Sequence, residues 1–137
     1  MTMATKQALI IDDSRTMRSI LRRVLTGLGF ECREAGDGQQ ALDALRAGPL
    51  PDVCLIDWNM PVMDGYTFVT SVRAEPAWRG ITLMMVTTES AHSQVVRALA
   101  AGAHEYVIKP FTADGITDKL RLLGLVEPAA FESGALA

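Results

Sequence analysis

The sequence has few cysteines, no long apolar run and no excess of positive charge, and each absence removes a class of protein. The two cysteines among 137 residues, Cys32 and Cys54, are too few and too far apart for a disulfide framework or a zinc site. We expect both to be small apolar residues within strands. The longest apolar runs are short, so we expect no membrane insertion. The N-terminal segment MTMATKQALI has no apolar stretch of signal-peptide length, which favours a cytoplasmic protein.

The net charge of −3 at pH 7 gives no reason to expect nucleic acid or an anionic membrane as a partner. A chain of this length is expected to form one domain, and its 49% hydrophobic and 21% charged residues are typical of a globular protein. We expect the folded domain to span residues 7–125. Residues 126–137 lack clear periodicity, which predicts a flexible C-terminal tail.

Short apolar runs alternate along the chain with segments of helical periodicity. The expected strands are 8–11, 30–35, 53–56, 81–86 and 106–108. A first helix is expected to begin after its N-cap Ser14 and to end at Gly27 and Gly29. The other expected helices are 39–47, 66–74, 92–101 and 113–123. Asp64-Gly65 predicts a turn that opens the third helix. Strand–helix units with short connections predict an α/β fold, with a doubly wound five-stranded parallel sheet in the order 2-1-3-4-5 and five helices.

Several basic residues have no partner that the sequence indicates. Arg15, Arg18 and Arg22 lie on a different face of the first helix from its apolar positions, and we expect that face to be solvated. His92 and His104 have no evident ligand or catalytic partner. We therefore expect both histidines to be incidental to the function.

Polar residues follow four of the five expected strands. Asp12 and Asp13 follow the first, Asp57 the third, Thr87 and Thr88 the fourth, and Lys109 the fifth. In open parallel sheets, ligands bind beyond the carboxyl ends of the strands, where the winding direction reverses. For the order 2-1-3-4-5 this point lies between strands one and three, so the fold is expected to bring three carboxylates together.

Three neighbouring carboxylates need a positive partner. At about 4 Å and an effective dielectric constant near 20, two carboxylates repel each other by roughly 4 kcal/mol, and a divalent cation removes this cost. An all-oxygen site with open positions suits Mg²⁺. A carboxylate can also act as the nucleophile in phosphoryl transfer. Lys109 and the Thr87 hydroxyl are residue types that bind phosphoryl oxygens.

These residues resemble those of response-regulator receiver domains. The resemblance rests on the acidic pair after the first strand, Asp57 followed by MPVMDG, Thr87, and the segment Lys109-Pro110-Phe111, and it covers about residues 7–125. It implies that Asp57 is the phosphoacceptor and that Tyr106 turns inward on activation. It implies that Mg²⁺ is bound directly by Asp13, Asp57 and the backbone carbonyl of Asn59, and through water by Asp12. The phosphoryl group would be contacted by Lys109, Thr87 and the Thr88 N–H. It also implies a flavodoxin-like fold and a cis Lys109-Pro110 bond.

The resemblance further implies partners. A sensor histidine kinase or histidine phosphotransfer domain would supply the phosphoryl group, and the surface of the fourth helix, fifth strand and fifth helix would then bind a target protein. We expect Tyr106 to be exposed before phosphorylation and buried afterwards. Trp58, Asn59, Glu89 and Tyr106 resemble chemotaxis regulators of the CheY type, which favours a flagellar-motor target. A stand-alone phosphorelay or stress-signalling receiver with another target is the alternative.

Three other classes of protein share parts of this pattern. A haloacid-dehalogenase-type phosphatase needs a second aspartate two residues after its nucleophile, where this chain has Asn59. A flavodoxin-type carrier cradles a phosphate in its first loop, where Asp12 and Asp13 would repel one. A receiver-like binding module usually lacks part of the site, and no part is missing here. We therefore expect a phosphoacceptor switch whose only chemistry is intrinsic phosphotransfer and autodephosphorylation.

Overall fold

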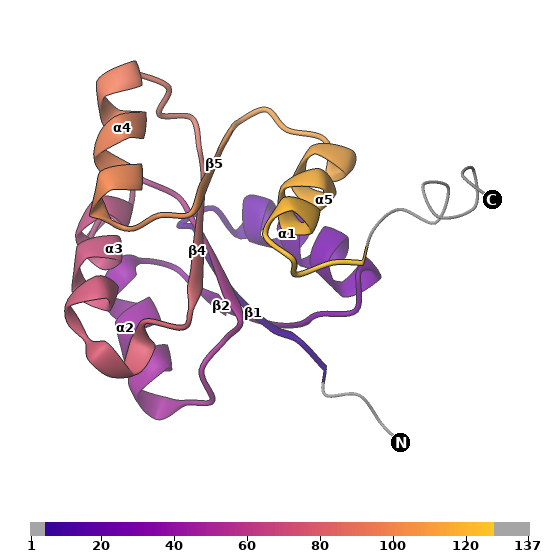
Figure 1. Cartoon of the computed structure of the whole chain (residues 1–137), viewed down its shortest axis with the longest axis horizontal. Helices are drawn as coiled ribbons and strands as arrows, with labels where there is room; N and C mark the ends of the chain where they lie inside the picture. The colour runs from indigo at the N-terminus through magenta and orange to yellow at the C-terminus, as the bar shows by residue number, and fades with distance from the viewer. Residues whose placement is uncertain (1–4, 128–137) are drawn as a thin grey trace.

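Five parallel strands form the centre of the molecule, and helices cover both faces of the sheet (Figure 1). The structure, a computed structural model, describes residues 5–127. The strands are β1 (Gln7–Ile11), β2 (Glu31–Ala35), β3 (Val53–Ile56), β4 (Thr82–Thr87) and β5 (Glu105–Ile108). The helices are α1 (Arg15–Gly27), α2 (Gly38–Ala47), α3 (Gly65–Ala74), α4 (His92–Ala101), α5 (Ala113–Leu122) and the short 3₁₀ helix η1 (Pro76–Trp78). The strand order β2-β1-β3-β4-β5 confirms the predicted doubly wound topology.

The sheet separates two apolar cores, because α1 and α5 lie on one face and α2, α3 and α4 on the other (Figure 1). Successive strand residues point to opposite faces. Along β1, Leu9 and Ile11 therefore join the core on the α2–α4 side, whereas Ala8 and Ile10 join the core on the α1–α5 side. All four side chains are buried, which explains why the central strands form continuous apolar runs in the sequence.

Most helices begin at a short polar side chain that accepts a hydrogen bond from the backbone N–H three residues later. These N-cap residues are Ser14, Asp37, Asp64 and Thr112. Helix α4 instead begins after Ala91 without a side-chain cap. The predicted strands and helices match the observed ones to within one residue at either end. Thr87 is the last residue of β4 rather than the residue after it, because β4 continues in register with β5 as far as Ile108.

Both cysteines lie in strands, as predicted. Cys54 is fully buried in β3, and burial raises the pKa of its thiol to about 12, whereas Cys32 is half-buried in β2. Within residues 5–127, no helix combines the length and the hydropathy that a bilayer crossing requires. Most of the predicted tail lies outside the described residues, and Val126, near its start, packs against the core on the α1–α5 side.

His104 has hydrogen-bond partners that the sequence does not indicate. Its Nδ1 accepts the Leu83 N–H at 3.0 Å and lies 3.2 Å from Nη2 of Arg73. The Arg73 guanidinium also donates to two carbonyls, to Gly102 through Nε and to Ile81 through Nη2. Burial, followed by the charge of Arg73, lowers the pKa of His104. His104 thus has a structural role, because its ring links the start of β4 to the segment that leads into β5, and the expectation that it is incidental to the function stays a prediction.

We expect His104 to make the protein less stable in mildly acidic solution. In the unfolded chain its pKa is about 6.5, and the folded pKa is lower, so its contribution is complete above about pH 6.5 and is lost as the pH falls through the folded pKa. The loss should be below about 1 kcal/mol because the ring is partly exposed. Urea unfolding at about pH 7.5 and about pH 5 measures it. His104→Asn keeps an acceptor for the Leu83 N–H without titrating, and an equal pH dependence in both proteins would contradict this assignment.

Candidate functional site

The ends of β1 and β3 bring the acidic residues together. Ile11 and Ile56 are partners in the sheet, so Asp12 and Asp57 follow neighbouring strands at the same edge. The Asp57 N–H donates to the Ile11 carbonyl at 2.9 Å, which extends the ladder to the aspartate itself. One carboxylate oxygen from each of Asp12, Asp13 and Asp57 lies within 4.8 Å of the others. The structure therefore forms the predicted cluster of three carboxylates.

The three carboxylates differ in how many hydrogen bonds their oxygens already accept. Both oxygens of Asp12 are bonded: Oδ1 accepts the Ser14 N–H and Oδ2 accepts the Lys109 ammonium, each at 2.8 Å. Asp13 is exposed to solvent. Asp57 is buried, and its Oδ1 has no hydrogen-bond partner within residues 5–127. A buried oxygen without a donor is costly. Asp57 and Asp13 are thus the carboxylates with oxygens free for a ligand.

Lys109 provides the positive charge of the cluster. It follows β5, where its N–H donates to the Thr87 carbonyl at 2.8 Å, and the Lys109-Pro110 bond is cis, as the resemblance implies. Its Nζ lies 2.8 Å from Asp12 and 3.5 Å from Oδ2 of Asp57, with only 12% of the side chain exposed. Three carboxylates and one ammonium leave a formal charge of −2, which favours a divalent cation. The oxygen donors fit Mg²⁺.

The β4 end supplies a buried hydroxyl beside this edge of the sheet. Thr87 is fully buried, and its Oγ1 accepts the Glu89 N–H at 3.3 Å. Thr88 and Asn59 are exposed, and within residues 5–127 neither side chain has a hydrogen bond to the acidic cluster. Their predicted roles belong to backbone atoms, so this exposure is compatible with those predictions.

Tyr106 does not have the exposed rotamer that we expected before phosphorylation. Only 9% of the residue is exposed, the ring packs in the core on the α2–α4 side, and its hydroxyl donates to the Glu89 carbonyl at 2.6 Å. Burial, with the nearby Glu89 and Asp57 carboxylates, raises its pKa to about 12, so the phenol remains a donor. The ring is inward here because the Glu89 carbonyl pairs its hydroxyl. The same Glu89 backbone also bonds Thr87, which links the two residues.

Gly65 is a site residue whose role the sequence does not reveal. Asp64 caps α3, as predicted, and the Gly65 N–H donates to the Trp58 carbonyl at 2.8 Å. A Cβ atom at Gly65 would overlap the backbone carbonyl oxygen of Asp57. The absence of a side chain therefore lets the first turn of α3 approach the backbone of Asp57. A glycine directly after a capping residue was the available signal.

Trp58 links the acidic edge to α4. Its ring is buried and stacks on Tyr66 with centroids 5.6 Å apart. The guanidinium of Arg97, on α4, lies 4.3 Å from the Tyr66 centroid and 5.9 Å from the Trp58 centroid. Trp58 directly follows Asp57, so its fluorescence is a suitable report on ligands at the cluster.

The fold and this site together define a flavodoxin-like α/β domain with a cluster of three carboxylates and one lysine at the switch point of its sheet. Residues 8–121 match the model of the response regulator receiver domain, and the chain belongs to this family. It is 40% identical over 116 residues to the chemotaxis protein CheY1 of Helicobacter pylori, covering 84% of this chain and 94% of that protein. It is 42% identical over 113 residues to a chemotaxis protein CheY homolog of Campylobacter jejuni, covering 82% and 87%.

Solved structures show the same fold. The chemotaxis protein CheY4 of Vibrio cholerae superimposes with a TM-score of 0.81 at 32% identity, over 87% of this chain and 98% of that one. A protein named as a putative response regulator, from Chloroflexus aurantiacus, superimposes with a TM-score of 0.80 at 32% identity, over 88% of this chain and 99% of that one. Both likenesses extend over nearly the whole described part of the chain.

Proposed function

We propose that this chain is a single-domain response regulator that accepts a phosphoryl group on Asp57. The observation that carries the proposal is Oδ1 of Asp57, which is buried without a hydrogen-bond donor among residues 5–127, beside Asp13 and Lys109. A sensor histidine kinase or a histidine phosphotransfer domain is the donor. The Asp57 oxygen attacks phosphorus, the new O–P bond forms as the bond to the donor histidine breaks, and the leaving imidazole takes up a proton.

The other residues of the cluster prepare this transfer. Asp13, Asp57 and the backbone carbonyl of Asn59 would hold Mg²⁺ directly, and Asp12, whose oxygens are already bonded, would hold it through water. Bound Mg²⁺ supplies charge neutralisation for the transferred group. Lys109 and Thr87 contact the phosphoryl oxygens, and the Thr88 N–H adds a backbone donor. The protein is then a switch with intrinsic phosphotransfer and autodephosphorylation rather than a conventional enzyme.

The backbone of Glu89 offers a route from the site to the surface. Its N–H donates to Oγ1 of Thr87 and its carbonyl accepts the Tyr106 hydroxyl. When the Thr87 hydroxyl turns to the phosphoryl group, the Glu89 N–H loses its acceptor and the segment before α4 must adjust. Tyr106, the switch aromatic, is already inward. Phosphorylation is therefore expected to stabilise this rotamer rather than to create it.

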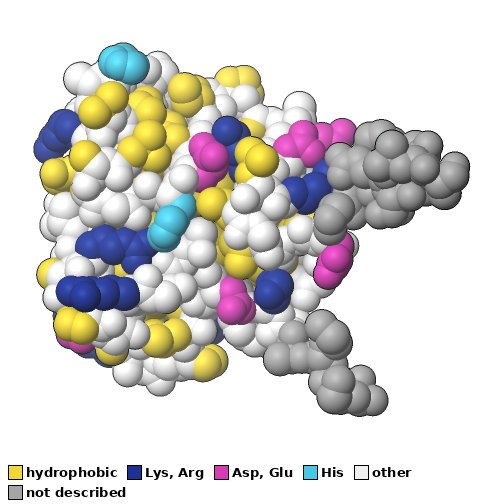
Figure 2. Space-filling view, viewed as in Figure 1, with side chains coloured by type: hydrophobic (Ala, Val, Ile, Leu, Met, Phe, Trp, Pro, Cys, Tyr) yellow, Lys and Arg dark blue, Asp and Glu magenta, His cyan; other side chains and the backbone are white. Residues whose placement is uncertain are grey.

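We propose that the output is a protein–protein contact made by α4, β5 and α5, with a flagellar motor-switch protein as the target. Hydrophobic side chains are exposed over α4 (Figure 2), and Val96, Leu99 and Ile108 are exposed large hydrophobic residues of α4 and β5. The chemotaxis relatives match over most of their own length, which supports this assignment. A receiver unit of residues 7–125, a cytoplasmic location and the absence of nucleic-acid or membrane partners belong to the same proposal. A phosphorelay or stress-signalling target is the alternative.

Phosphorylation is tested with a small phosphodonor such as acetyl phosphate. We expect labelling of the purified chain that requires Mg²⁺, is abolished by a chelator, and is removed by mild base because an acyl phosphate hydrolyses readily. A phosphorylated histidine kinase domain should transfer its label in the same Mg²⁺-dependent manner. Labelling that persists unchanged in the chelator would contradict the proposed site.

The target is tested by binding to immobilised motor-switch protein. We expect binding to increase at least about tenfold with beryllofluoride, a phosphoryl mimic on Asp57, which corresponds to a coupling within the usual allosteric range. Asp57→Asn is the control, because it lacks the carboxylate to which beryllofluoride binds. If motor-switch protein bound the chain neither with nor without beryllofluoride, this target would be wrong, and the phosphorelay or stress-signalling alternative would be favoured.

A further inference from the structure

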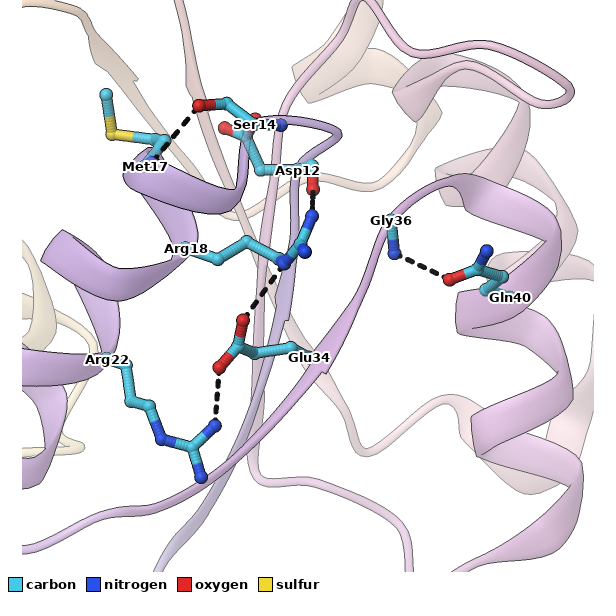
Figure 3. Close-up of polar contacts among 8 residues, drawn as sticks. All are labelled: Asp12, Ser14, Met17, Arg18, Arg22, Glu34, Gly36 and Gln40. Carbon is cyan, nitrogen blue, oxygen red and sulfur yellow. Dashed lines mark hydrogen bonds and ion pairs between the residues drawn. The ribbon is translucent and has the colours of Figure 1, made fainter.

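Arg18 does not belong to a freely solvated face, because it lies between the acidic turn and β2 (Figure 3). Its Nη1 donates to the backbone carbonyl of Asp12 at 2.6 Å, and its Nε donates to the Glu34 carboxylate at 2.9 Å. Only 17% of the side chain is exposed. Arg22, one turn later on α1, binds the other oxygen of Glu34 at 2.5 Å. The sequence expectation of a solvated face therefore fails for Arg18.

The Asp12 carbonyl belongs to the peptide unit that joins Asp12 to Asp13. Because a peptide unit is planar, holding its oxygen also orients the Cα atom of Asp13. The next peptide unit, between Asp13 and Ser14, is held from the other side, since the Ser14 N–H donates to Oδ1 of Asp12 at 2.8 Å. Asp13 itself is exposed, yet both peptide units that flank it have a fixed partner.

Glu34 keeps Arg18 in place. Burial alone would raise the pKa of Glu34, but hydrogen bonds from Arg22 and then Arg18 outweigh it and hold the pKa below its usual value. Glu34 therefore stays ionised near neutral pH and compensates one of the two arginine charges. The contact of Arg18 with the acidic turn itself is a directed hydrogen bond to a backbone carbonyl.

We propose that Arg18 is a positioning residue that orients Asp13 for Mg²⁺, acting through the backbone of the Asp12–Asp13 turn. This inference rests on the proposed function, because it assumes that Asp13 is a metal ligand. Residues that orient metal ligands from behind typically change metal affinity by about 10- to 100-fold when they are replaced. Arg18 would be such a residue even though it is not expected to touch the metal.

The sign of the effect separates positioning from charge. Removing a positive charge near three carboxylates would by itself tighten Mg²⁺ binding, whereas loss of positioning weakens it. We expect Arg18→Ala to weaken Mg²⁺ binding about tenfold. Arg22→Ala is the matched control, because it also removes one positive charge and one hydrogen bond to Glu34 but leaves the contact between Arg18 and the Asp12 carbonyl. This variant should bind Mg²⁺ at least as tightly as the parent.

The measurement is a Mg²⁺ titration followed by Trp58 fluorescence in a Trp78→Phe background, with thermal unfolding as a check on folding. Exchange of the Ser14 amide hydrogen without Mg²⁺ gives a second readout, and it should be faster in Arg18→Ala than in Arg22→Ala. Arg18→Gln is the second variant if Arg18→Ala does not fold, since its amide is expected to reach Glu34 but not the Asp12 carbonyl.

The outcomes distinguish this inference from the proposed function. Weaker Mg²⁺ binding in Arg18→Ala, with parent-like binding in Arg22→Ala, would support it. Binding in Arg18→Ala as tight as in the parent, or tighter, would overturn the role of Arg18 and leave the magnesium site intact. A parent that fails to bind Mg²⁺ would overturn the magnesium site, and the role of Arg18 would fall with it.

Discussion

Asp13→Asn is expected to abolish detectable Mg²⁺ binding. Asp13 is the exposed member of the carboxylate cluster, and its substitution removes both a proposed ligand oxygen and one unit of the negative charge that attracts the cation. Asp12 cannot easily replace it, because its two oxygens already accept the Ser14 N–H and the Lys109 ammonium. A Mg²⁺ titration with Trp58 fluorescence, in a Trp78→Phe background, measures the loss.

The control is Asp43→Asn, which makes the same change in charge on the exposed surface of α2, where Asp43 pairs with Arg46. We expect this variant to bind Mg²⁺ within about twofold of the parent, because exposed charges beyond a Debye length are largely screened. Binding by Asp13→Asn that equals binding by Asp43→Asn would show that the cation lies elsewhere.

Gly65→Ala is expected to destabilise the protein by about 3 kcal/mol, because overpacking against a fixed backbone has few ways to relax. The new Cβ would overlap the backbone carbonyl of Asp57, and it would also lie close to Ile56, a buried residue at the end of β3. Either α3 or the Asp57 backbone must move. We therefore expect urea unfolding to show the loss of stability, and acetyl phosphate labelling to slow in the molecules that remain folded.

Gly27→Ala is the matched control for this prediction. Gly27 is the last residue of α1, and a Cβ added there meets no atom within 4 Å. Alanine is favoured over glycine in a helix by up to about 1 kcal/mol, so this variant should be as stable as the parent or slightly more stable. If Gly65→Ala were as stable as Gly27→Ala, the close approach of α3 to Asp57 would not be required by the fold.

The fold could be predicted from the sequence because local signals and apolar periodicity agree. Ser14 and Asp64 cap helices where the periodicity begins, and the apolar runs match strands that are buried on both faces. The cluster of Asp12, Asp13 and Asp57 followed from the same reasoning, since parallel strands with a known order place their carboxyl ends at one edge.

The features that sequence reasoning missed depend on contacts between distant segments. The inward rotamer of Tyr106 depends on the Glu89 carbonyl, which only the path of the chain before α4 places within reach. The guanidinium of Arg18, on α1, binds Glu34 on β2, and this contact holds it where it can also donate to the Asp12 carbonyl. Helical periodicity identifies the face on which a side chain lies, but it contains no information about a partner sixteen residues away.

The inward Tyr106 has a consequence for the proposed switch. A ring that is already paired with Glu89 needs less reorganisation before a partner binds to α4, β5 and α5. Partner binding and the inward rotamer should favour each other reciprocally. We therefore expect the unphosphorylated protein to retain measurable affinity for its target, with phosphorylation of Asp57 adding to it.

The central claim is that Asp57 is the residue that accepts the phosphoryl group, and the most direct measurement locates that group. The chain is treated with acetyl phosphate and Mg²⁺, reduced with borohydride, which converts an aspartyl phosphate to homoserine, and analysed by tandem mass spectrometry. We predict homoserine at position 57 and nowhere else, no conversion in a chelator, and none in Asp57→Asn. Conversion at Asp12 or Asp13, or a phosphorylated chain without conversion at position 57, would contradict the account.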